Sequence, residues 1–255
     1  MTEITTLEKK AQKLLQQGQN EEASAIFHRA GNAYAARKNH HAASLCYASA
    51  ASSSAQTFGD RLYYYAANDY EKAGQQAYLT GDLVYTVQLY KHAADCHERD
   101  KDYDNFARCF LIYQEYQREH LKRCLLRPGK YLFHKAARNK IGTYVNTLAQ
   151  WLALSISYYV WGHGEQPYRI IISSAFFVLF CALLYTQMDL TAGGQVFRPT
   201  FLESIFFSVN TFTAGGYFDV FAIGASRVLV VLESFAGLFI IPLFITGLCR
   251  KYLRF

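Results

Sequence analysis

Hydrophobic and polar positions follow different patterns in two parts of the chain. Up to residue 140, apolar residues recur at helical spacing among many charged and polar ones, whereas from residue 141 onward charges are few. Apolar residues at helical spacing predict amphipathic helices that pack through one face. Long uncharged runs are typical of helices that span a membrane. The sequence therefore predicts an all-α chain in which a soluble helical domain precedes a membrane domain.

An internal repeat organises residues 7–126. Its two motifs recur 43 positions apart, Phe27-x-x-Ala30-Gly31 as Tyr70-x-x-Ala73-Gly74 and Tyr47-x-x-Ala50-Ala51 as Tyr90-x-x-Ala93-Ala94. An aromatic residue near small residues on one helix face forms a knob beside a hole, which favours closely stacked helical hairpins. Breaks between the helices are expected at residues 18–20, 38–39, 58–60, 81–82 and around 100, with Asn20, Asp60 and Asp82 as N-caps.

The membrane half contains two segments long enough to cross a bilayer. Ile170–Met188 has no charge, and Val228–Cys249 has Glu233 as its one charge. Phe201–Asn210 between them is a shorter amphipathic run. Ile141–Trp161 is also uncharged, but polar residues interrupt it and its apolar residues form one stripe. This pattern favours an interfacial helix on the membrane surface, and a third spanning helix stays the alternative.

Pro128-Gly129 ends the last soluble helix, because proline and glycine together break helical patterns. Three regions follow from these boundaries. They are a helical repeat domain at 1–126, a basic linker with the interfacial helix at 127–162, and a two-helix membrane domain at 163–255.

The net charge of +6 is concentrated before the membrane half. Residues 118–140 contain 8 Lys/Arg and 1 Asp/Glu. A basic cluster beside a membrane attracts anionic lipid, by roughly 1 kcal/mol per residue near the surface. A solvated helix face explains the same charges equally well. No nucleic-acid partner is expected, since the neighbouring membrane segments favour lipid.

Location and chemistry are constrained by what the sequence lacks. The N-terminus is polar without an apolar core segment, so no signal peptide is expected, and the six scattered cysteines suit a reducing compartment. Basic residues flank the two spanning segments, at Arg169, Arg250, Lys251 and Arg254. By the positive-inside rule they predict a multi-pass protein of the cell membrane with both termini in the cytoplasm. The eight histidines show no metal-ligand spacing and no catalytic constellation is present, so neither an enzyme nor a cofactor is expected.

The most informative stretch is Thr211-Phe-Thr-Ala-Gly-Gly-Tyr-Phe-Asp219, a Gly-rich loop after the amphipathic run. A loop at membrane depth is tolerated only where protein buries it or where it lines a water-filled path. Here the chain resembles the pore domain of two-helix, potassium-channel-like proteins, whose filter reads Thr-Val-Gly-Tyr-Gly-Asp after Thr-Phe-Thr. Ala214, Gly215 and Phe218 depart from that pattern.

The resemblance extends over roughly residues 141–255. Tyr159–Arg169 is similar to the segment before the outer helix of these proteins, and Gly224–Arg227, Glu233 and Gly237 are similar to the start of their inner helix. It implies a homotetramer that conducts monovalent cations, with no other metal bound, through a ring of backbone carbonyls. The implied filter residues are Thr213, Ala214, Gly215, Gly216, Tyr217, Phe218 and Asp219.

Physical arguments refine these roles. Gly215 and Gly216 can adopt positive φ freely and so turn their carbonyls inward, whereas Phe218 does so only at a cost. Because Ala214 also lacks a hydroxyl, weaker potassium selectivity is expected. Asp219 either concentrates cations at the outer mouth or is an ordinary loop residue.

Three residues of the second spanning segment are candidates for supporting the pore. Glu233 is expected to bond backbone or hydroxyl groups behind the filter, with snorkelling to the interface as the alternative. Gly237 and Pro242 either form a gate hinge or are ordinary membrane-helix residues. A plain membrane hairpin without conduction is the alternative to the pore itself.

The repeats resemble tetratricopeptide-like units, especially those of the SNAP adaptor proteins. The resemblance rests on Ala30-Gly-Asn-Ala-Tyr34, Tyr70-Glu-Lys-Ala-Gly74 and Leu89-Tyr-Lys-His-Ala-Ala94. It implies a surface for self-assembly or for an unknown protein or ligand. The tyrosines 63, 64, 65, 113 and 116 are partner anchors or, preferably, residues of the stack. Because little chain follows the second spanning segment, the repeats are expected to control the gate, and a role in assembly or localisation alone is the alternative. A membrane-anchored adaptor without conduction is the alternative function.

Overall fold

The structure is a computed structural model that describes residues 2–56, 62–131, 140–215 and 219–253. The chain divides into two compact units, Met1–Ser155 and Ile156–Phe255. It is mostly helical, with a stack of helical hairpins in the first unit and two long apolar helices in the second. These features confirm the prediction of a mostly helical chain with a helical stack followed by two long apolar helices.

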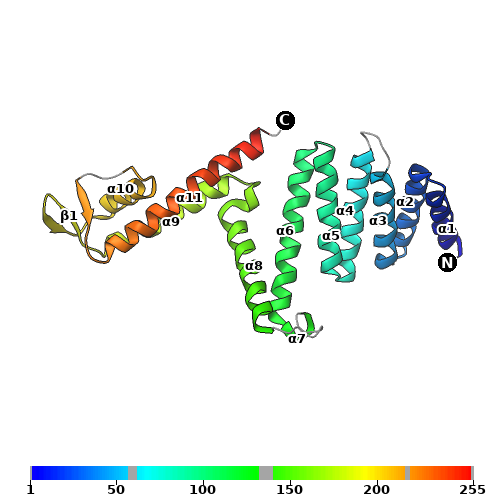
Figure 1. The fold of residues 1–255 in the computed structure, drawn as a ribbon, viewed down its shortest axis with the longest axis horizontal. Helices are drawn as coiled ribbons and strands as arrows, with labels where there is room; N and C mark the ends of the chain where they lie inside the picture. Colours follow the sequence, from blue (N-terminus) through cyan, green and yellow to red (C-terminus); the bar gives the residue numbers. More distant parts are fainter. Residues whose placement is uncertain (1, 57–61, 132–139, 216–218, 254–255) are drawn as a thin grey trace. The chain divides into compact units, whose positions relative to one another are not determined.

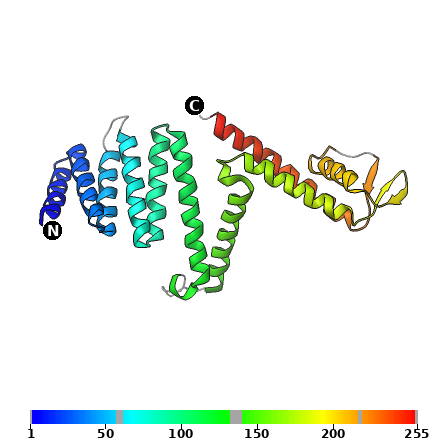
Figure 2. The same cartoon turned by 180° about the vertical axis from the view of Figure 1, so that it is seen from behind.

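The first unit is a stack of antiparallel helices in which each helix packs on the next in the chain (Figures 1 and 2). The stack consists of α1 (Thr2–Gln16), α2 (Asn20–Ala36), α3 (His40–Ala55), α4 (Leu62–Thr80), α5 (Leu83–Arg99) and α6 (Tyr103–Leu126). The short α7 (Pro128–Tyr131) follows, and α8 (Lys140–Trp161) begins in this unit. Helix α6 ends where Pro128-Gly129 predicted a break.

Short turns of one kind join α1 to α2, α2 to α3, α4 to α5 and α5 to α6. In each turn a residue after the helix end has positive φ. This conformation lets backbone N–H groups of the turn donate hydrogen bonds to carbonyls of the last helical turn. The residues with positive φ are Gly18, Lys38, Gly81 and Lys101. The side chains of Asn39, Asp82 and Asp102 then cap α3, α5 and α6. The prediction that Asn20 caps α2 is wrong, because Asn20 is already helical and the preceding Gln19 makes no side-chain cap bond. Asp60 lies outside the described residues.

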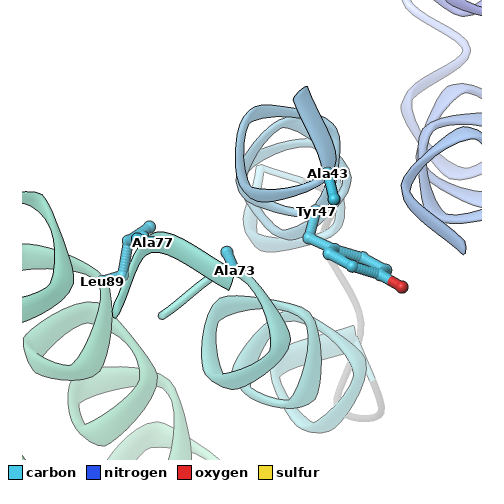
Figure 3. Close-up of a cluster of buried hydrophobic side chains, with 5 residues drawn as sticks. All are labelled: Ala43, Tyr47, Ala73, Ala77 and Leu89. Carbon is cyan, nitrogen blue, oxygen red and sulfur yellow. The ribbon is translucent and has the colours of Figure 1, made fainter. Parts of the chain in front are cut away.

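The repeated aromatic and small residues hold the stack together. Tyr47 of α3 lies in a buried cluster with Ala43, Ala73, Ala77 and Leu89 (Figure 3). A β-carbon added to Gly31 would lie 2.8 Å from the Tyr47 ring, and one added to Gly74 would lie 2.8 Å from the Tyr90 ring. Each glycine is therefore the hole for the tyrosine of the next helix. The sequence predicted knobs and holes, and the structure identifies the pairs.

The second unit contains the end of α8, a 3-10 turn at Gly162–Gly164, α9 (Tyr168–Tyr185), α10 (Phe201–Phe212) and α11 (Ser226–Tyr252). Helices α9 and α11 are long and apolar enough to cross a membrane, and α10 is shorter and apolar. Within the described residues α8 does not meet that criterion of length and hydropathy.

A small antiparallel sheet was not anticipated by the all-α prediction. Its strands are β1 (Leu190–Ala192), β2 (Gln195–Phe197) and β3 (Val220–Ala222), in the order β2-β1-β3. Gly193 and Gly194 both have positive φ and form the tight hairpin between β1 and β2. Leu190 of β1 faces Phe197 of β2 and Ala222 of β3. The sheet thus joins the chain before α10 to the chain after the Gly-rich loop.

Substituting Gly74 should test the knob-and-hole packing. Gly74→Ala places a methyl group against the Tyr90 ring, and the overpacking should lower the free energy of unfolding by about 1–3 kcal/mol. Gly129→Ala is the matched control, because Gly129 lies in a helix and an added β-carbon there meets nothing within 4 Å. Thermal unfolding of the detergent-solubilised chain measures both. Equal midpoints for the two variants would contradict this packing.

Candidate functional site

The short helix α10 leads directly into the Gly-rich loop, and local bonds close both of its ends. At its start Thr200 and Glu203 form a capping box, with the Thr200 backbone N–H donating to Oε2 of Glu203 at 2.7 Å. At its end the N–H of Ala214 donates to the Thr211 carbonyl and that of Gly215 to the Asn210 carbonyl, at 3.1 and 2.9 Å. This paired pattern is a Schellman cap. Helix α10 therefore has a defined end at the first residues of the predicted filter.

The first filter residues differ from expectation. Ala214 is the left-handed residue of the cap, with φ of 54°, while Gly215 does not have positive φ. A side chain in this conformation costs about 1 kcal/mol. Thr213 is the C-cap, and its hydroxyl donates to the Val209 carbonyl. Gly215 thus does not use the positive φ that glycine permits, and the inward turn of its carbonyl stays a prediction. Gly216, Tyr217 and Phe218 lie outside the described residues, and Asp219 beyond them is exposed.

Behind α10 a buried carboxylate joins the three helices of the second unit. Glu233 of α11 is fully buried. The Tyr185 hydroxyl of α9 donates to its Oε2 at 2.8 Å, and the Ser208 hydroxyl of α10 contacts its Oε1. Ser208 also lies 2.9 Å from the Val178 carbonyl of α9. The structure therefore places Glu233 against hydroxyl groups inside the unit. The sequence predicted this arrangement, with snorkelling to the membrane surface as the alternative.

Helix α11 crosses close to the end of α10. The Ser234 hydroxyl donates to the Thr211 carbonyl at 3.2 Å. One turn further on, a β-carbon added to Gly237 would overlap the Phe212 carbonyl. Gly237 therefore permits a close helix crossing, a role that the sequence analysis did not anticipate. Helix α11 continues through Pro242 without a break, so the described conformation gives no specific support to a hinge.

A hollow of about 370 Å³ lies beside the start of the loop, lined by Ala214 of the loop and by residues of α10, β3 and α11 that include Asn210 and Ser234. It adjoins the residues that precede the undescribed part of the loop. In a single chain this side of α10 is open.

At its other end α11 is joined to the turn before α9. Nε of Arg250 lies 3.0 Å from Oε1 of the buried Glu165. The same turn is tied to the end of α8, because Ser157 bonds His163 at 2.8 Å and Arg169 donates to the Tyr158 carbonyl at 2.9 Å. These contacts link the ends of α8, α9 and α11 into one cluster, which the sequence analysis did not predict.

The helical stack contains a separate groove of about 560 Å³ between α2 and α4. Nδ1 of His28 lies 2.6 Å from Oδ1 of Asp69, and Nζ of Lys72 lies 3.5 Å from the other nitrogen of the same ring. Burial raises the pKa of Asp69, and His28 and Lys72 oppose that rise. Tyr64 and Tyr65 line this groove with exposed rings, unlike the half-buried tyrosines 63, 113 and 116. Sequence reasoning named the tyrosines but missed the charged residues beside them.

The predicted lipid-binding segment is described only in part. Residues 132–139 of the basic stretch 118–140 lie outside the described residues. Lipid contact by this stretch therefore stays a prediction.

Comparisons with known proteins do not identify the chain. No protein family, curated protein or solved structure matches it.

Substitution of Glu233 should show whether its buried carboxylate stabilises the second unit. Glu233→Ala leaves the buried Tyr185 hydroxyl without its acceptor, which should lower the free energy of unfolding by about 1–3 kcal/mol. Glu233→Gln should do much less harm, since an amide accepts from Tyr185 and donates to Ser208. Thermal unfolding in detergent measures the difference. Wild-type behaviour of both variants would show that these contacts do not stabilise the unit.

Proposed function

We propose that this protein is a homotetrameric channel for monovalent cations, with an atypical filter at Ala214–Asp219. The observation that carries the proposal is the position of α10. This short capped helix packs against both membrane-length helices, is bonded to them through Ser208 and Glu233, and ends at a Gly-rich loop. A plain membrane hairpin requires none of these features.

Electrostatics support a cation as the permeant ion. The C-terminal end of a helix has a partial negative charge of roughly half an elementary charge. The C-terminal end of α10 is at Thr213–Gly215, where the loop begins. Several copies of α10 arranged around one axis would direct these partial charges to a common point and stabilise a cation there.

The proposal requires more than one copy, because two helices and one loop cannot surround an ion. The open side of α10, with its hollow beside Ala214, is where a second copy would pack. The resemblance of the loop to potassium-channel-like filters makes four copies the specific expectation. The departures at Ala214 and Phe218 make weak selectivity the expectation for conduction.

A membrane-anchored adaptor is the second candidate, and the groove between α2 and α4 favours it. Exposed tyrosines beside charged groups are typical of protein-binding surfaces. This function would use the membrane helices as a tether alone. The two functions are compatible if the groove binds a partner that controls the channel.

Conduction by the purified chain in planar bilayers tests the channel. We expect a tetramer by native mass spectrometry and currents carried by both potassium and sodium, with weak preference in bi-ionic reversal potentials. The double substitution Ala214→Thr and Phe218→Gly should raise the potassium preference, because it restores two of the three positions that depart from the family pattern. A folded tetramer without current would support the adaptor, and a stable monomer would contradict the pore.

The cluster at the end of α11 suggests how the channel is regulated. Glu165→Gln removes the ion pair with Arg250, weakens the attachment of the end of α11 to the turn before α9, and should raise the open probability. Asp189→Asn is the matched control, because it removes the exposed pair with Arg198 in the same unit. Single-channel recording measures both.

Deleting residues 1–126 tests whether the repeats control the gate. An unchanged open probability in the truncated channel would limit the repeats to assembly or localisation.

A further inference from the structure

Three buried side chains of different helices meet inside the helical stack. They are Glu71 of α4, His97 of α5 and Cys109 of α6, whose exposed fractions are 7%, 0% and 0%. One oxygen, nitrogen or sulfur atom of each lies within 4.8 Å of the other two. Nε2 of His97 is 2.8 Å from Oε1 of Glu71. A carboxylate, an imidazole and a thiol in one buried place are three of the ligand types that zinc prefers.

The internal repeat shows that this cluster is specific to one junction. Counting back 43 positions, Cys109 corresponds to Ala66, His97 to Ser54 and Glu71 to His28. Ala66 and Ser54 are buried like their counterparts, so the same stack accommodates small residues at these positions. The packing of the repeat therefore does not require a thiol or an imidazole at the second junction. Spacing along the sequence gave no metal pattern because the three residues come from three different helices.

The surroundings of His97 provide a second, independent observation. Its Nδ1 is buried and has no hydrogen-bond partner among the described residues. Oδ2 of Asp102 is the nearest carboxylate, 3.6 Å from Nδ1. Histidine ligands of metals donate their other N–H group to a carboxylate in this position. Asp102 also caps α6, so its place is fixed by the backbone.

The charges of the three side chains suit a divalent ion. A divalent ion bound to one thiolate and one carboxylate gives a neutral core. Binding displaces the thiol proton to solvent as the sulfur–metal bond forms, and no oxidant or reductant is needed. Arg108, which lies 2.7 Å from Oε1 of Glu71 and is half exposed, can remain on the outer side of the carboxylate.

We propose that Glu71, His97 and Cys109 bind a zinc ion that links α4, α5 and α6, with Asp102 orienting His97. Both oxygens of Glu71 together with Nε2 and Sγ supply four ligand positions. The expected bonds are about 2.3 Å to sulfur and about 2.0–2.2 Å to nitrogen and oxygen, so the three side chains must close on the ion by small rotations. The metal would fix the junction between the second repeat and the last helix of the stack.

The experiment uses the full chain in detergent, purified without a histidine tag and freed of metal by a chelator. Titration with Co²⁺ should give a thiolate-to-cobalt charge-transfer band and the intense visible bands of a tetrahedral site. Titration with Zn²⁺ should remove those bands at about one ion per chain, and it should raise the thermal unfolding midpoint.

Repeat-guided substitutions provide the variants. Cys109→Ala and His97→Ser introduce the residues of the first junction, and each should weaken zinc binding by at least about 100-fold. Asp102→Asn keeps a good N-cap and should weaken zinc binding by about tenfold. Cys96→Ala is the control, because Cys96 precedes His97 but packs against Ala66 and Ala67. It should bind cobalt and zinc like the wild-type chain.

The alternative is a hydrogen-bonded network in which Glu71 accepts bonds from His97 and Arg108 without any metal. Two results would establish that alternative and overturn the proposal. One is a folded wild-type chain that shows no thiolate-to-cobalt band. The other is a Cys109→Ala variant that binds cobalt and zinc as tightly as wild type does.

Discussion

The second unit depends on the requirement that a carboxylate inside an apolar helix must be bonded. Such a group is costly at membrane depth unless partners satisfy it. Glu233 finds its partners on the two other helices of the unit, Tyr185 on α9 and Ser208 on α10. Helix α10 is too short to span a membrane, so these contacts and its caps keep it between the long helices. One buried carboxyl group thereby helps to hold in place the helix that leads into the Gly-rich loop.

The first unit depends on a different constraint, the close approach of repeated helices. Gly31 and Gly74 leave room for one tyrosine ring each, and alanines fill the remaining contacts. This packing repeats every 43 residues and leaves the polar residues free to differ between junctions. His28 and Asp69 adjoin an open groove at the first junction, while Glu71 and His97 are buried at the second. The same scaffold thus presents two different chemical environments.

Much of this organisation could be predicted from residue patterns. The helices of the stack, the break at Pro128 and the two long apolar helices all follow from local periodicity and composition. The pairing of Tyr47 with Gly31 could be inferred only as a repeat of knobs and holes, because the sequence does not say which knob meets which hole. The strands β1–β3 were missed, since three-residue strands give no detectable period.

The site was predictable only in its outline. The loop and Glu233 were found through their resemblance to a known motif, whereas the cap at Ala214 arises from bonds that cross from α10 into the loop. The contact between Gly237 and Phe212, the pair of Arg250 with Glu165, and the cluster at Cys109 join residues far apart in the chain. Local patterns do not contain such information, because it arises from the packing of separate helices.

The pairing of β1 with β3 has a consequence for how the loop could evolve. These strands bring residues 190–192 beside residues 220–222, so the ends of the excursion through α10 and the loop are held together by main-chain hydrogen bonds. Main-chain bonds do not depend on side-chain identity, and the entropy of loop closure changes only slowly with length. Closure of the loop therefore does not depend on the side chains at its tip. In the proposed channel, this short ladder would therefore allow the sequence of the loop to change, and ion preference with it, while the main-chain closure stays the same.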